Sequence, residues 1–216
     1  MKKTKGKLFG IAGILLAAFA LWTLAVQHID VQAIGPNGSS VGFAGLNGWV
    51  HDLTGVHMGL YVLTDWLGLV SMGFVLGFAV LGLVQWMRRR KLFRVDHDIL
   101  LLGGFYLLVL ILYLVFETVA VNARPVLIDG RLEASYPSST TMLVLCVMPT
   151  AMMQLRARIR NTKVRTIVLT ILAVFTACMV VGRLIAGVHW FTDIIGGVLL
   201  SAGLVALYDA IEKKMK

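Results

Sequence analysis

Cysteine, proline and charged residues are all scarce in this sequence. It contains two cysteines and four prolines in 216 residues, and charged residues make up 14% of the chain. Two cysteines give no indication of a disulfide framework, and both lie inside apolar runs, so we expect Cys146 and Cys178 to be buried free thiols. Internal repeats, low-complexity tracts and linkers are also missing, which favours a single domain.

Long apolar runs are what the sequence has in abundance. Hydrophobic residues make up 58% of the chain, and its mean hydropathy is +0.85, which points to a bilayer. About 20 residues cross the hydrocarbon core. Six segments fit or approach that length, the fourth and sixth only if extended outward to Ser138 and His189: 8–27, 66–87, 99–116, 141–155, 166–182 and 194–208. They predict an all-α fold, a six-span transmembrane helical bundle, in one integral membrane domain of residues 1–216.

The basic residues fall on alternate sides of the six spans. All but three of the 20 lysines and arginines come before the first span, after the second, after the fourth or after the sixth. These residues are Lys2, Lys3, Lys5, Lys7, Arg88, Arg89, Arg90, Lys91, Arg94, Arg156, Arg158, Arg160, Lys163, Arg165, Lys213, Lys214 and Lys216. The positive-inside rule places that side and both termini in the cytoplasm, so we expect a multi-pass protein of the cell membrane, of the bacterial plasma-membrane type. The net charge of +9 is then a topology signal that favours anionic lipid headgroups, and not nucleic acid, as neighbours.

The first outer segment, residues 28–65, predicts a turn followed by a short interfacial helix. Its start is rich in Gly and Asn, and apolar residues recur at helical spacing from Ser40 onward, with Ser39 or Ser40 as the N-cap. Trp49 and Trp66 are expected at headgroup level. The two histidines of this segment, His51 and His57, are assigned a solvated or structural role, with substrate contact as the alternative.

Three basic residues remain for the outer side: Arg124, Arg131 and Arg183. Two of them lie at span ends within polar clusters. "ETVAVNARPV" follows the third span, "YPSSTTM" precedes the fourth, and "GRLIAGVHWFTDIIGG" joins the fifth to the sixth. Because these connections share one face of the membrane, we expect the three clusters to converge there.

The residue types in these clusters suit the binding of an anion. Arginine presents a planar fork to phosphate oxygens, and a helix that starts with the run SSTT adds hydroxyl and backbone donors. His189 and Asp193 are one helical turn apart, so the carboxylate can orient the imidazole and leave its other nitrogen free as a nucleophile or base. Gly187 offers the break that would bring Arg183 and His189 to one site.

Each cluster taken alone has a simpler explanation. An Arg-Pro pair at a helix end is also typical of an arginine that extends to lipid headgroups, and SSTT of an ordinary helix start. Glu117 would then be an ion-pair partner of Arg124 or Arg183. The spacing Arg-x5-His-x3-Asp is more specific, and so is the convergence of three clusters on one face.

At these residues the sequence resembles the type 2 phosphatidic acid phosphatase superfamily of membrane lipid phosphatases. The third motif of that family, S-R-x5-H-x3-D, is matched by "GRLIAGVHWFTD" at Arg183, His189 and Asp193, with Gly182 in place of serine. The order of the motifs, their spacing and the six-span layout agree over a phosphatase-like core of residues 60–210.

The other two motifs are matched in part. The second motif of the family is P-S-G-H, and "PSST" at 137–140 has Ser139 and Thr140 in place of the glycine and the histidine. The first motif is K-x6-R-P, and "ETVAVNARP" keeps the Arg-Pro pair at Arg124 but has Glu117 where the lysine belongs.

The resemblance implies a phosphohistidine mechanism that uses no cofactor. His189 would attack phosphorus, Asp193 would orient its ring, and Arg124 and Arg183 would stabilise charge on the phosphoryl oxygens. The hydroxyl residues Ser138, Ser139 and Thr140 would bind the substrate phosphate. No metal is implied, because no part of the sequence has metal-ligand spacing.

Thr140 and Glu117 bear on the choice of substrate. In the family the second-motif histidine protonates the leaving group, and a hydroxyl cannot replace an imidazole as an acid. We therefore expect diphosphate lipids, such as isoprenoid diphosphates of the undecaprenyl diphosphate type, to be preferred. Glu117 is the alternative acid if its carboxyl is buried and its pKa raised.

The sequence as a whole predicts a phosphatase that removes phosphate from a phosphorylated lipid at the outer leaflet. Phosphatidic acid and phosphatidylglycerol phosphate are the other candidate substrates, and membrane lipids are the expected neighbours. Two alternatives stay open: a phosphotransferase that passes phosphate from His189 to a lipid, and a catalytically impaired relative that binds or moves phospholipid. The oligomeric state is left open.

Overall fold

The computed structural model describes residues 2–215, with side chains from residue 6 onward, so Lys216 lies outside the described residues. Within them six helices are long and apolar enough to cross a membrane, and no strand is formed. They are α1 (Lys2–His28), α3 (Met58–Arg89), α4 (His97–Thr118), α5 (Ser139–Arg158), α6 (Thr162–Ile185) and α7 (Phe191–Met215). A short helix α2 (Ala44–Thr54) and two 3-10 turns, η1 (Pro36–Gly38) and η2 (Leu92–Arg94), lie in the connections. The predicted all-α, six-span bundle is confirmed.

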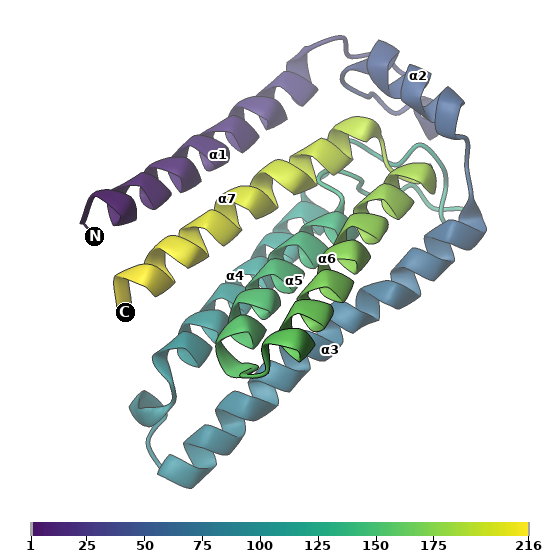
Figure 1. Cartoon of the computed structure of the whole chain (residues 1–216). Coiled ribbons are helices and arrows are strands. Elements are labelled where there is room, and N and C mark those ends of the chain that lie inside the picture. Colours follow the sequence, from purple (N-terminus) through teal and green to yellow (C-terminus); the bar gives the residue numbers. More distant parts are fainter. Residues whose placement is uncertain (1, 216) are drawn as a thin grey trace.

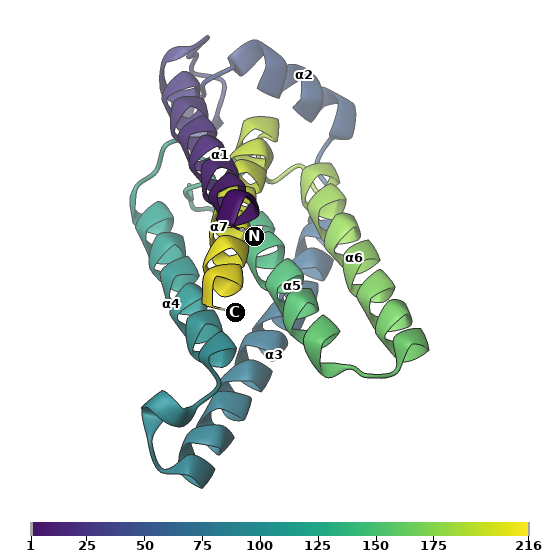
Figure 2. The same cartoon turned by 60° about the vertical axis from the view of Figure 1, so that its left-hand side comes forward.

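Helices α5 and α7 form the centre of the bundle (Figures 1 and 2). Half of the apolar window of each is buried within the protein, against 11–28% in the other four spans. A central helix faces other helices and not lipid, so it can carry polar residues whose hydrogen bonds are satisfied inside the protein. Accordingly α5 has the lowest hydropathy of the six, 1.2. Its buried Thr150 and Gln154 bond to Tyr106 Oη at 3.3 Å and Tyr208 Oη at 2.7 Å.

Helix α1 lies alongside α7 in both views (Figures 1 and 2). Gly203 of α7 permits this approach, because a Cβ there would lie 2.8 Å from Cδ2 of Leu16. One to two turns further along α1 the ring of Phe19 stacks on Tyr136, at 6.2 Å between centroids, and Thr23 Oγ1 lies 2.7 Å from Tyr136 Oη. The first span therefore also supports the connection between α4 and α5.

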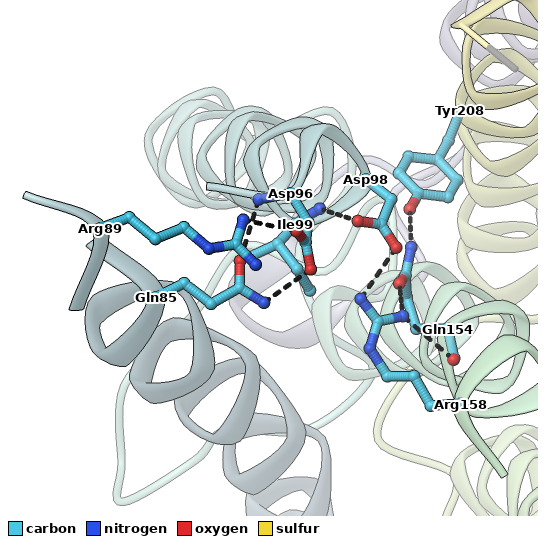
Figure 3. Close-up of polar contacts among 8 residues, drawn as sticks. All are labelled: Gln85, Arg89, Asp96, Asp98, Ile99, Gln154, Arg158 and Tyr208. Atoms are coloured by element: carbon cyan, nitrogen blue, oxygen red, sulfur yellow. Dashed lines mark hydrogen bonds and ion pairs between the residues drawn. The ribbon is translucent and has the colours of Figure 1, made fainter. Parts of the chain in front are cut away.

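A polar network joins α3, α4, α5 and α7 at one end of the bundle (Figure 3). Arg89 at the end of α3 pairs with Asp96 at 2.7 Å, and Arg158 at the end of α5 pairs with Asp98 at 2.8 Å. Arg158 also donates to Gln154, whose amide reaches Tyr208. These contacts hold together the helix ends that carry the basic clusters, so the polar clusters of the sequence lie at the opposite end.

Two expectations about local structure are wrong. Helix α2 begins at Ala44, and its N-cap position is Phe43 with a left-handed backbone (φ 50°), not Ser39 or Ser40. The backbone before it is held instead by a bridge in which Gln32 and Val41 exchange hydrogen bonds of 3.1 and 2.8 Å. Cys146 is a buried thiol as expected, but Cys178 is exposed because it lies on an outward-facing side of α6.

Other features of the outer segment agree with the sequence. Trp49 and Trp66 are 64% and 70% exposed, and their depth in a membrane stays a prediction. The His51 ring lies 5.4 Å from that of Trp190, and His57 Nε2 lies 2.9 Å from the carbonyl oxygen of Thr54. Both contacts are internal to the protein, which favours a structural role for these histidines.

Candidate active site

The polar clusters of the sequence meet at the end of the bundle opposite the network of Figure 3. The α4–α5 connection contributes Arg124 and Ser135, the start of α5 contributes Ser138, and the α6–α7 turn contributes His189. All four are buried, with at most 6% of their surface exposed. In Figure 1 this end lies beneath α2, where α6 ends and α7 begins.

A tight turn between α6 and α7 brings Arg183 and His189 together. Gly187 in this turn has φ +68°, and a Cβ there would lie 1.9 Å from the carbonyl oxygen of Gly55. Only glycine combines a left-handed backbone with so close an approach. The turn ends α6 at Ile185 and lets Nη2 of Arg183 lie 3.1 Å from Nε2 of His189. The break predicted at Gly187 is confirmed.

The contacts of His189 define which ring nitrogen carries the proton. A guanidinium can only donate, so Nε2 accepts from Arg183 and the proton resides on Nδ1. Nδ1 lies 3.0 Å from Oγ of Ser135 and 3.2 Å from its carbonyl oxygen, both of which can accept that proton. The lone pair of Nε2 therefore faces the arginine, as a nucleophile toward a bound anion requires.

Asp193 reaches His189 through Ser135 and not directly, so that part of the expectation is wrong. Helix α7 begins at Phe191, so His189 precedes the helix and the two residues are not one turn apart on it. Oγ of Ser135 donates a short hydrogen bond to Oδ2 of Asp193 and can accept from His189. The carboxylate also accepts from Trp190 N at 2.9 Å and Asn122 Nδ2 at 3.3 Å. A buried chain thus runs from Asp193 through Ser135 to His189.

The two arginines each carry an acidic partner and share one aromatic ring. Nη1 of Arg183 lies 2.9 Å from Asp65, and Nε of Arg124 lies 3.1 Å from Glu133. The guanidinium carbons lie 4.9 Å (Arg183) and 5.7 Å (Arg124) from the centroid of Tyr61, within range of cation–π attraction. Glu133 lies out of line with the Nε–H bond, so Nε and Nη1 of Arg124 keep no hydrogen-bond acceptor, and neither does Nε of Arg183. These buried donors are available to an anion.

The hydroxyl run is placed at the start of α5, as predicted. Ser138 is the N-cap residue, is fully buried, and its Oγ has no hydrogen-bond partner. Its backbone N–H donates to the carbonyl oxygen of Asp193 at 3.1 Å, which fixes α5 against α7. Ser139 and Thr140 line the cavity described below. The backbone N–H groups of the first turn add the positive end of the helix dipole.

Glu117 is neither the ion-pair partner of an arginine nor the buried acid that the sequence suggested. It lines the cavity but is exposed, so it is not the buried carboxyl that was expected of an acid. Neither arginine pairs with it, because Glu133 and Asp65 hold those places. Arg131 is also exposed, in a tight turn where it bonds to Ile128.

Gly182, which stands where the family has serine, lies at a close helix crossing. A Cβ there would lie 3.0 Å from Cγ2 of Thr64 on α3. The same threonine accepts a hydrogen bond of 3.2 Å from Nη1 of Arg183. The glycine thus lets α3 approach α6 closely enough for Thr64 and Asp65 to hold the arginine.

A cavity of about 1310 Å³ extends from the arginines along the groove between α3 and α4. On α3 its lining runs from Tyr61 to Trp86, which is about 38 Å of helix. Small residues form part of its wall: Gly68, Ala79, Gly82, Gly103 and Gly104. Exposed apolar side chains, among them Leu83 (48%) and Leu107 (63%), border it, so the groove opens on the lipid-facing surface. Its polar end contains both arginines, Asp65, Glu117, Glu133, Ser139 and Thr140.

The surroundings of His189 keep its imidazole neutral. Burial lowers its pKa well below the ordinary 6.5, and the positive charges of Arg124 and Arg183 lower it further. A neutral imidazole at physiological pH is the form that can attack an electrophile. Among residues 2–215 no three His, Cys, Asp or Glu side chains gather closely enough to hold a metal ion.

Comparison with known proteins decides the family. A sequence model of the PAP2 superfamily matches residues 100–215, more than half of the chain and all of the buried polar chain described above. The protein belongs to the PAP2 superfamily. The match includes Arg124, Ser138, Arg183, His189 and Asp193, which are the residues singled out by the three motifs.

The fold is shared with a solved structure of a transmembrane PAP2 protein. The crystal structure of the first transmembrane PAP2 type phosphatidylglycerolphosphate phosphatase, from Bacillus subtilis, aligns with a TM-score of 0.63. The alignment covers 95% of this chain and 98% of that one at 20% sequence identity, so it establishes a common fold. A search of curated protein sequences finds no match to this chain.

Five residues of this site were missed from the sequence: Tyr61, Asp65, Asn122, Ser135 and Glu133. Ser135 and Asn122 lie in an irregular connection where no periodicity marks the facing side. Tyr61 and Asp65 lie on α3, which begins at Met58, eight residues before the predicted span. One signal in the sequence could have indicated them. Asp65 follows Tyr61 by four positions at the end of a span, a spacing that places both residues on one helix face.

Proposed function

We propose that this PAP2 protein is a phosphatase of phosphorylated lipids that works through a phosphohistidine on His189. One observation carries the proposal. The buried chain from Asp193 through Ser135 holds the imidazole with Nε2 toward Arg183, next to arginine nitrogens that have no acceptor. Such an arrangement of an oriented neutral imidazole and free cationic donors suits phosphoryl transfer.

The reaction would have two steps. In the first, Nε2 of His189 forms a bond to phosphorus while the bond from phosphorus to the leaving oxygen breaks. The proton on Nδ1 stays hydrogen-bonded to Ser135, and Asp193 stabilises the positive charge that the ring gains. In the second, water attacks the phosphohistidine and releases inorganic phosphate and the free imidazole. Arg124, Arg183 and the hydroxyl of Ser138 would bind the three phosphoryl oxygens in both steps.

The groove between α3 and α4 supports a lipid as the substrate. Its polar end contains the phosphate-binding arginines, and its remaining length is lined mainly by apolar residues that open toward the membrane interior. Its extent along α3, about 38 Å, exceeds the roughly 30 Å thickness of the hydrocarbon core. A long polyprenyl chain would use this length more fully than a single fatty acyl chain.

The leaving group favours a diphosphate substrate. Thr140 occupies the position of the family's acidic histidine and cannot donate a proton near neutral pH. When a diphosphate ester is hydrolysed, the leaving group is a phosphate monoester. This group is a much weaker base than an alkoxide, so it leaves without protonation by an acid. We infer that isoprenoid diphosphates of the undecaprenyl diphosphate type are preferred over phosphatidic acid.

The basic clusters support an outer-leaflet site. They lie at the end of the bundle that contains the network of Figure 3, so the positive-inside rule favours a position outside the cytoplasm for the opposite end, with His189. A single cysteine at Arg131, in a chain whose Cys146 and Cys178 are replaced by alanine, should then react with an impermeant reagent on intact cells. A cysteine at Arg90 should react only after lysis. The reverse pattern would put the site in the cytoplasm.

A substrate panel on purified protein tests the activity. Release of phosphate should be fastest from a polyprenyl diphosphate and slower from phosphatidic acid and phosphatidylglycerol phosphate. His189→Ala should abolish release from all three, and His51→Ala, which removes a histidine of α2 whose ring lies 5.4 Å from that of Trp190, should not. Full activity in His189→Ala would reject the mechanism. An inactive wild type that still binds these lipids would identify an impaired relative.

A further inference from the structure

The acidic partner of Arg183 has a position that the phosphatase chemistry alone does not explain. Nη1 of Arg183 binds Asp65 at 2.9 Å, while Nη2 of the same guanidinium binds Nε2 of His189 at 3.1 Å. A phosphate that approaches Nε2 along this guanidinium must therefore come next to the Asp65 carboxylate. The arginine side chain is 1% exposed and cannot turn away, whereas that of Asp65 is 45% exposed and borders the cavity.

A carboxylate in an anion-binding site favours anions that carry a proton. Ionised carboxylates only accept hydrogen bonds, so an oxyanion without a proton meets repulsion there and no bond. A terminal phosphate has a second pKa near 6, so it carries a proton on one oxygen for part of the time near neutral pH. A phosphodiester and a sulfate have no such proton. A site with two arginines alone would bind all of these anions.

We propose that Asp65 determines specificity by accepting a hydrogen bond from the P–OH group of a terminal phosphate held at Arg183. This inference rests on the proposed function and names the form of phosphate that the site selects. A membrane protein is surrounded by phospholipids, most of which carry a phosphodiester in the headgroup. Asp65 keeps those monoanions from occupying the site and admits the terminal phosphate of a monoester or diphosphate lipid.

Glu133 provides a matched comparison. It is a second half-exposed carboxylate on the cavity wall and is paired with the other arginine, Arg124, at 3.1 Å. Glu133 contacts Nε of Arg124, and Arg124 makes no hydrogen bond to His189. Glu133 is therefore not linked through its arginine to Nε2 of His189, the atom proposed to attack phosphorus. Removing its charge should strengthen the binding of every anion alike and leave the preference among them unchanged.

Inorganic phosphate and sulfate test whether the site requires a protonated oxygen, because only phosphate carries a proton near neutral pH. Their affinities are measured by isothermal titration calorimetry at constant ionic strength, on full-length protein in detergent and without turnover. The wild type should bind phosphate at least about tenfold more tightly than sulfate, since a hydrogen bond to a charged group is worth that much. In Asp65→Asn the preference should fall below about threefold, mainly because sulfate binds better: an amide can donate to it where a carboxylate repels it. In Glu133→Gln the wild-type preference should persist.

The outcomes separate this inference from the proposed function. If the wild type binds phosphate and sulfate equally, or if Asp65→Asn keeps the wild-type preference, the role of Asp65 is overturned and the phosphatase proposal stands. Loss of the preference in Glu133→Gln would also overturn the assignment to Asp65. If the wild type binds neither anion, the phosphate site itself is wrong, and with it both proposals. A second readout is inhibition of phosphate release by a soluble phosphodiester, glycerophosphoglycerol, which should affect Asp65→Asn at least about tenfold more strongly than wild type.

Discussion

Nη2 of Arg183 lies 3.1 Å from Nε2 of His189, and neither side chain is more than 3% exposed. The arginine donates to the nitrogen that would attack phosphorus, so it holds the ring in the required tautomer while the site is empty. A phosphoryl group must displace this contact and take the guanidinium as its own ligand. Nε2 is thus covered until an anion binds the arginine and replaces this contact.

Ser135 should be a positioning residue for His189. Ser135→Ala removes the hydroxyl between Asp193 and Nδ1, so kcat should fall about 10- to 100-fold while KM changes little. Steady-state kinetics on a diphosphate lipid check this. Asp193→Asn should be slower still, because the carboxylate also stabilises the charge on the ring. The double variant should be no slower than Asp193→Asn alone, since both act through one chain. Additive losses would mean that Ser135 and Asp193 act separately.

The two site arginines should not tolerate lysine. Arg183→Lys and Arg124→Lys keep the charge but lose the planar fork, so kcat/KM should fall about 10²- to 10³-fold for each. Arg131→Lys, on an exposed turn, serves as the control and should behave like wild type. The test is to measure kcat/KM of purified variants whose thermal stability matches that of the wild type. A Lys variant as active as wild type would show that bidentate binding is unnecessary.

The leaving group can be tested by restoring an acid. Thr140 lines the cavity and has Gly68 as a near neighbour, 3.8 Å from the position of a Cβ on that glycine, so a larger side chain has room. Thr140→His should raise turnover of phosphatidic acid by at least about tenfold and leave a diphosphate lipid nearly unchanged. Glu117→Gln should change neither rate if no carboxyl acts as the acid. A selective loss of monoester turnover in Glu117→Gln would instead identify glutamate as the donor.

The buried neutral state of His189 predicts how stability depends on pH. Its folded pKa lies well below 6.5, so below that pH the unfolded chain binds a proton that the folded chain does not. The contribution is fully present above pH 6.5 and is lost as the pH falls, by at most about 1.4 kcal/mol per pH unit. Burial lowers the pKa of His51 in the same direction. Denaturant unfolding in detergent between about pH 7.5 and about pH 5.5 should therefore be less steeply pH-dependent in His189→Gln than in wild type. An identical slope would show that His189 takes up a proton over this range equally in the folded and unfolded states, so that its pKa is not lowered by folding.

Much of this architecture could be predicted from the sequence because a bilayer leaves few solutions. Apolar runs of span length gave the six helices, and Gly187 gave the break that joins Arg183 to His189. Helix ends were predicted less well. The second span was expected from Trp66, but α3 starts at Met58, because the less apolar segment 58–65 is helical too. That difference concealed Asp65.

The direct contact between His189 and Asp193 was wrong for a related reason. A spacing of four predicts one helical turn only if the helix includes both residues, and α7 starts between them. The carboxylate is then held at the first turn by the N–H of Trp190, and Ser135 from another connection fills the distance to the ring. Contacts of this kind depend on how two irregular connections fold over each other, which local periodicity does not encode.

Trapping the covalent intermediate tests the account most directly. A polyprenyl diphosphate labelled in its terminal phosphate is mixed with the enzyme and quenched in alkaline detergent, which preserves phosphohistidine. Peptide mapping should find the label on His189, at Nε2, during turnover, with none in His189→Ala and slower formation in Ser135→Ala. Continued release of phosphate with no label on His189, or with the label on another residue, would contradict the mechanism.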